Sequence, residues 1–124
     1  MSFDLWFACK DPASSFDRAA ARSWFGERGY DVSHPSQAAM LTEEGDMPWD
    51  FDISEDPFDP PPPTDRPIVA VGSVGWASAG GEEFNRFLGE VEAFATAFSL
   101  VFCDPQDADT PFQFHDAKGL SDSG

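Results

Sequence analysis

Nine carboxylates between positions 43 and 65 form the densest group of side chains that could bind a cation or a basic partner: Glu43, Glu44, Asp46, Asp50, Asp52, Glu55, Asp56, Asp59 and Asp65. Calcium prefers several closely spaced oxygen ligands, so part of this run looks at first like a calcium-binding loop. The glycine that lets an EF-hand loop turn and its terminal bidentate glutamate are both missing from the spacing. The sequence therefore predicts no metal site here.

Aromatic residues lie among these acids, at Trp49, Phe51 and Phe58. A few desolvated aromatic anchors inside a charged rim are typical of protein interfaces. Two interpretations stay open, because a run of acids can equally be a solvated face. If the segment docks a protein, the predicted partner-binding residues are Asp46, Trp49, Asp50, Phe51, Asp52, Glu55, Asp56, Phe58 and Asp59.

Few side chains in the sequence suit acid–base or nucleophilic catalysis. His34 and His115 both stand in loop-like contexts, and no serine or cysteine nucleophile occurs at a recognisable motif. Cys9 and Cys103 each end a strand-like run, so they are interpreted as small core residues and not as a disulfide. The glycines between 72 and 81 match neither a dinucleotide nor a phosphate-binding fingerprint. We therefore predict that the chain is not an enzyme and needs no cofactor.

The charge balance favours a basic partner. Against 23 Asp and Glu there are 7 Lys and Arg, a net charge of −16. Such a charge repels phosphate backbones and anionic membranes, and it speeds association with a basic protein by about 10- to 1000-fold. We expect no direct contact with nucleic acid or membrane, although the acidity could instead serve solubility or a high-salt cytoplasm.

The first ten residues predict a cytoplasmic location. They have no basic start, and Asp4 interrupts their apolar run, so they resemble neither a signal peptide nor a membrane span. We expect the chain to be a monomer or to form a 1:1 heterodimer with its partner.

Hydrophobic spacing predicts the elements that position these groups. Alternation of apolar residues indicates strands, and recurrence at three and four residues indicates helices. Strands are expected at 3–9, 37–42, 47–53, 68–77 and 99–103, and helices at 15–28 and 82–98, with a further edge strand from Phe112, Phe114 and Leu120. Ser14 and Asp17 resemble a capping box, Gly29 a helix stop, and Gly45 with Asp46 a hairpin turn. Gly72 and Gly75 suggest that backbone or an aromatic ring approaches the strand closely.

These elements predict an α+β fold. Its single mixed or antiparallel sheet would have about five strands with two helices packed on it. The 124 residues include 13 Phe and 4 Trp, enough apolar area for one domain spanning 1–124. Six prolines among acids make 54–67 an acidic proline-rich loop, and 117–124 is expected to be a flexible tail.

Two segments resemble a family of small bacterial proteins. The opening Met1–Phe7, MSFDLWF, resembles the "MS, aromatic, DL, aromatic, aromatic" start of proteins that look like immunity partners of polymorphic toxins. Glu83–Gln106 resembles their "helix, apolar strand, DPQ" ending. The resemblance implies an immunity protein that occludes the active or substrate-binding site of a cognate toxin, such as a nuclease or nucleic-acid deaminase with a basic surface. The alternatives are an acidic DNA mimic that inhibits a defence enzyme and a small enzyme that uses Asp and His.

Overall fold

The computed structural model describes residues 2–11, 13–41, 45, 47–54, 66–75, 82–106, 109 and 112–117. The elements in chain order are β1 (Ser2–Cys9), α1 (Arg18–Glu27), β2 (Gln37–Met40), β3 (Trp49–Asp52), β4 (Ala70–Gly75), α2 (Glu82–Phe98), β5 (Leu100–Cys103) and β6 (His115–Asp116). The strands form one antiparallel sheet in the order β2-β3-β4-β1-β5-β6. The predicted α+β class is confirmed, with six strands in place of about five.

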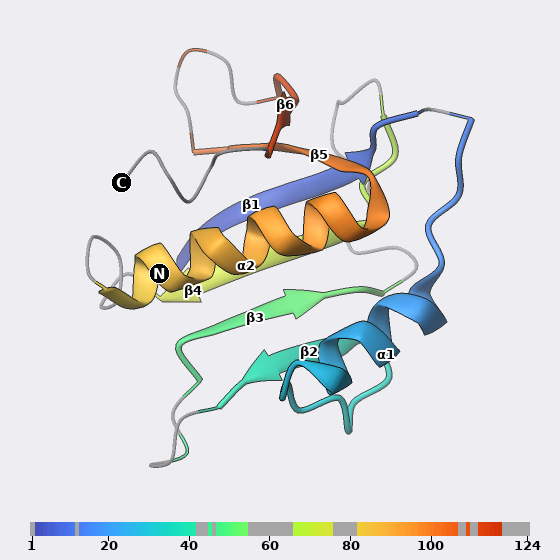
Figure 1. Cartoon of the computed structure of the whole chain (residues 1–124). Coiled ribbons are helices and arrows are strands. Elements are labelled where there is room, and N and C mark those ends of the chain that lie inside the picture. Colours follow the sequence, from blue (N-terminus) through green and yellow to red (C-terminus); the bar gives the residue numbers. More distant parts are fainter. Residues whose placement is uncertain are drawn as a thin grey trace.

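Both helices pack on the same face of the sheet (Figure 1). The Phe25 ring of α1 lies 4.9 Å from the Phe51 ring of β3, centroid to centroid. On α2, the Phe94 ring lies 5.2 Å from Phe7 of β1 and 5.5 Å from Phe51. The main core therefore lies between the helices and one sheet face, and alternation along each strand turns every second side chain to the opposite face. This open face is partly exposed over β3 and β4, but between β1 and β5 it is covered, and Ala8, Val101 and Cys103 are buried there.

The first helix begins later than its sequence suggests. Asp17 is the N-cap residue, since its Oδ1 accepts a hydrogen bond from the amide of Ala20 at 3.0 Å. The expected cap at Ser14 is wrong, because the amide of Ser14 instead donates to the carbonyl of Asp11 in a preceding turn. The stop at Gly29 is confirmed: its φ of +90° is one that glycine adopts without a steric cost.

The second helix runs directly into β5, as predicted. Phe87, Val91 and Phe94 are fully buried along one side of α2. Ser99, with a φ of 54°, reverses the chain, and β5 begins at the next residue.

The close approach expected at Gly72 is confirmed, whereas the one expected at Gly75 is wrong, because nothing lies within 4 Å of a Cβ atom built there. A Cβ atom built at Gly72 would lie 2.9 Å from Cε1 of Phe51 and 3.3 Å from Cε2 of Phe7. Any larger residue at Gly72 would therefore collide with two core rings.

The end of the described chain differs from the prediction. Its last strand is β6, which contains neither Phe112 nor Phe114, and Leu120 lies outside the described residues. Ala117 is 1% exposed and belongs to the core, so a flexible tail that starts at 117 is wrong at its first residue. Residues 118–124 lie outside the described part, as do 55–65 of the acidic proline-rich loop.

Candidate functional site: the open face of the sheet

Trp49 and Phe51, two of the predicted partner-binding residues, lie in the core. They are 2% and 0% exposed, and both face the helices from β3. Their rings contact Phe87 of α2, at centroid distances of 6.4 and 5.8 Å. The prediction that these rings are exposed anchors is therefore wrong. Alternation placed them correctly on one side of their strand, but burial of the large rings assigns that side to the core and leaves the carboxylates on the other.

The acids of β3 lie on the open face together with an aspartate from the start of the chain. Asp50 is in register with Ser73 of β4, and Ser73 is in register with Asp4 of β1. The hydroxyl of Ser73 donates to Oδ1 of Asp4 at 2.7 Å. Asp4, Asp50 and Asp52 thus share one face, which we call the acidic face. Sequence reasoning missed Asp4, because strand register brings it there across many intervening residues.

Asp50 is a partly buried acid of the acidic face. Burial raises its pKa, the nearby charges of Asp52 and Asp4 raise it further, and a hydrogen bond from Gln37 opposes the shift. That bond runs from Nε2 of Gln37 to Oδ2 at 2.7 Å. The ionised carboxylate is therefore held at an energetic cost, which a cation brought by a partner would reduce.

Apolar side chains accompany the acids on this face. Met47 is 50% exposed, and its sulfur lies 3.9 Å from Nε2 of Gln37, the group that bonds Asp50. Trp6 of β1 alternates with the buried Leu5 and Phe7, so it faces the open side and is half-buried there. Met47 is thus the exposed apolar side chain next to these acids, whereas the Trp6 ring stacks on Phe112 at a centroid distance of 5.7 Å.

The remaining predicted partner-binding residues cannot be placed. Asp46, Glu55, Asp56, Phe58 and Asp59 lie outside the described residues.

The histidines and cysteines, which could act in catalysis or metal binding, do not form a cluster in the described part of the chain. Nδ1 of the exposed His34 bonds its neighbour Ser36, and His115 lies on the edge strand β6. Cys9 and Cys103 are both free thiols. Within the described ranges, no group of three His, Cys, Asp or Glu side chains is arranged to hold a metal ion.

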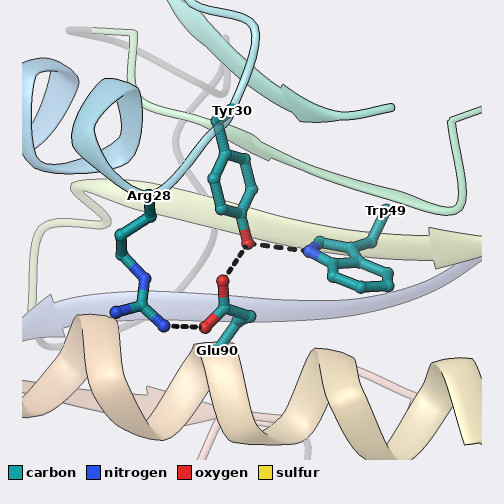
Figure 2. Close-up of polar contacts among 4 residues, drawn as sticks. All are labelled: Arg28, Tyr30, Trp49 and Glu90. Atoms are coloured by element: carbon teal, nitrogen blue, oxygen red, sulfur yellow. Dashed lines mark hydrogen bonds and ion pairs between the residues drawn. The ribbon is translucent and has the colours of Figure 1, made fainter. Parts of the chain in front are cut away.

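A partly buried polar network lies on the helix side of the sheet (Figure 2). Nε1 of Trp49 donates to the Tyr30 hydroxyl at 2.8 Å, and that hydroxyl donates to Oε1 of Glu90 at 3.0 Å. Arg28 forms an ion pair with the other oxygen of Glu90. Burial strongly raises the pKa of Tyr30, so the phenol stays protonated and can donate. The network joins the end of α1, β3 and α2, a combination that local sequence patterns do not reveal.

The start of the chain contacts the segment that follows β5. The side-chain amide of Gln106 accepts from the amide of Asp4 at 2.7 Å and donates to the carbonyl of Asp4 at 2.8 Å. Oδ1 of Asp104 accepts from the backbone amide of Gln106 at 2.9 Å and orients the turn. β5 ends at Cys103, so it has no residue left to pair with Asp4 of β1. The side chain of Gln106 takes this place and continues the hydrogen bonding along that side of β1.

Comparisons with known proteins assign no family to the chain. Scans of family models, of curated proteins and of solved structures found no match to the chain. Neither helix in the described part of the chain is long and apolar enough to cross a membrane.

Proposed function

We propose that the chain is an immunity protein, which binds a cognate bacterial toxin and occludes its active or substrate-binding site. The partner would carry a basic surface, as a nuclease or nucleic-acid deaminase does where it holds phosphates. The observation that carries the proposal is the acidic face, where Asp4, Asp50 and Asp52 lie beside the exposed Met47.

The spacing of these carboxylates suits several separate cationic side chains. Asp50 and Asp52 stand two residues apart on one strand, a separation of about 7 Å. Asp4 lies two strands from Asp50, about 10 Å away. A bound metal would need its oxygen ligands within about 2.6 Å of one point, whereas lysine and arginine side chains can each pair with a different carboxylate.

Electrostatics favour such a partner at long and short range. The net charge of −16 attracts a basic surface from a distance and orients the encounter. At contact, the partly desolvated Asp50 gains most from a positive neighbour, because burial and adjacent acids have already raised its pKa. Met47 adds exposed apolar area within the charged surroundings.

The resemblance of the chain's two segments supports the same proposal. Gln106 and Asp4, one from each segment, are bonded to each other, so the segments form one structural unit at the border of the acidic face. An immunity protein acts by occlusion, which requires no catalytic residue.

Co-expression with the product of the adjacent gene tests the proposal. If that product arrests growth, the chain should relieve the arrest and co-purify with it as a complex. The double variant Asp50→Asn/Asp52→Asn should protect less well, while Glu27→Gln/Glu82→Gln, which removes two charges from exposed helix positions, should protect normally. Persistent growth arrest and the absence of a complex with the unmodified chain would contradict the proposal.

A further inference from the structure

A groove on the helix side of the sheet is separate from the acidic face. It lies between α2 and the β2–β3 pair and has a volume of about 480 Å³. This falls in the range of about 300–1,000 Å³ that is usual for small-molecule sites. The lining residues are Arg28, Met40, Trp49, Arg86, Gly89 and Glu90.

Two arginines line the groove, and only Arg28 forms an ion pair within the described part of the chain. Arg28 is paired with Glu90, and Glu90 also accepts from the Tyr30 hydroxyl, so this carboxylate is already neutralised and bonded. Arg86 differs: within the described part of the chain it forms no ion pair, although acids outnumber bases by 23 to 7 in the sequence. Its guanidinium carbon lies 5.5 Å from the centroid of the Trp49 ring.

The surrounding residues hold Arg86 ready for an anion. Trp49 is fixed by its bond to Tyr30, and the attraction between guanidinium and indole holds the arginine over the ring. Gly89 stands in the interior of α2, where glycine is disfavoured, and its missing side chain leaves space in the groove wall. The half-buried Met40 adds an apolar contact surface.

We propose that this groove binds a small amphipathic carboxylate, a carboxylic acid attached to a compact apolar group. The planar guanidinium of Arg86 would pair with both carboxylate oxygens, a geometry that arginine forms readily. The apolar group would lie against Met40 and the backbone of Gly89. This binding site is independent of the acidic face and of the toxin partner proposed above.

Phenylacetate and its uncharged analogue phenylacetamide test the site on the full chain. In ¹H–¹⁵N spectra, phenylacetate at millimolar concentrations should shift the assigned indole N–H signal of Trp49 saturably, and phenylacetamide should not. Arg86→Gln should weaken binding about tenfold or more, the usual effect of losing charge-assisted hydrogen bonds. Arg22→Gln is the matched control, because this exposed arginine of α1 bonds the carbonyl of Val32 and does not line the groove.

Three results would overturn the proposal. If the unmodified protein binds phenylacetate and phenylacetamide equally well, the carboxylate does not contribute to recognition. This result does not depend on whether the Arg86 variant folds. Unchanged affinity after Arg86→Gln, with Arg22→Gln as reference, would place the ligand elsewhere. Tighter binding of a blocked peptide that carries one glutamate would identify a protein segment, and not a small molecule, as the occupant.

Discussion

Replacing Gln106 with alanine tests how the two ends of the chain are joined. The amide of this side chain makes two hydrogen bonds to the backbone of Asp4, at 2.7 and 2.8 Å. Alanine removes both of them and leaves the N–H and C=O of Asp4 to water. Since β1 lies between β4 and β5, the loss weakens a strand in the interior of the sheet.

The expected loss of stability follows from the number of bonds. A typical intramolecular hydrogen bond contributes about 0.5–1.5 kcal/mol net, so two of them amount to about 1–3 kcal/mol. Both bonds are exposed, and partial replacement by water keeps the loss within this range. For a domain of this size, the corresponding decrease in Tm is roughly 3–12 °C.

Urea unfolding of the unmodified chain, Gln106→Ala and Gln113→Ala measures this loss. Gln113 is the matched control, since it is exposed and makes no hydrogen bond through its side chain within the described residues. Gln106→Glu should also be destabilised, because a carboxylate cannot donate to the carbonyl of Asp4. If Gln106→Ala is as stable as the Gln113 control, the inferred continuation of β1 hydrogen bonding by Gln106 is wrong.

Three further substitutions test the core, the polar network and the acidic face. Gly72→Ala should cost about 1–3 kcal/mol of unfolding free energy, because the new Cβ would lie 2.9 Å from the Phe51 ring. Gly75→Ala is the control and should change the unfolding free energy by less than about 0.5 kcal/mol, because nothing lies within 4 Å of its Cβ position. Similar values for the two variants would contradict the packing around Gly72. Tyr30→Phe should cost about 1–3 kcal/mol by removing the hydroxyl between the buried Trp49 and the partly buried Glu90, and no measurable change in denaturant unfolding would refute a stabilising network. Because the fold raises the pKa of Asp50 above its ordinary 3.8, its ionised form opposes folding at neutral pH, and this cost disappears as the pH falls through the raised pKa. Asp50→Asn should therefore stabilise the chain at neutral pH, with the gain shrinking on acidification; a gain independent of pH would show another cause.

The elements with strong periodicity could be predicted from sequence. The apolar positions of α2 recur at helical spacing over several turns, and its buried face matches that pattern. Gly72 was also informative, because a glycine inside a strand pattern indicates a close approach, here by the Phe51 ring.

The candidate site was less accessible to sequence reasoning. Alternation in β3 grouped Trp49 with Phe51 and Asp50 with Asp52 but could not show which pair faces the core. The side depends on where the helices pack, a tertiary property. Asp4 was missed for a related reason: strand pairing brings it near Asp50 through Ser73, and register is not encoded locally.

The network around Glu90 shows the same limit. Its members lie on α1's end, β3 and α2, and each has an ordinary local context in the sequence. Only the packing of α1 and α2 against one sheet face brings them together. The ends of short elements were also uncertain, as the shift of the α1 cap from Ser14 to Asp17 shows.

The most direct test of the proposed role is the rate at which the chain associates with the toxin, measured by stopped-flow fluorescence at low and high salt. Asp50→Asn/Asp52→Asn and Glu27→Gln/Glu82→Gln each remove two negative charges from a net of −16, so they differ only in where the charge is lost. If the acidic face docks the toxin, the first pair should slow association several-fold at low salt and the second should change it little, with the difference fading at about 0.5 M salt. Equal rates for the two double variants would contradict docking through the acidic face.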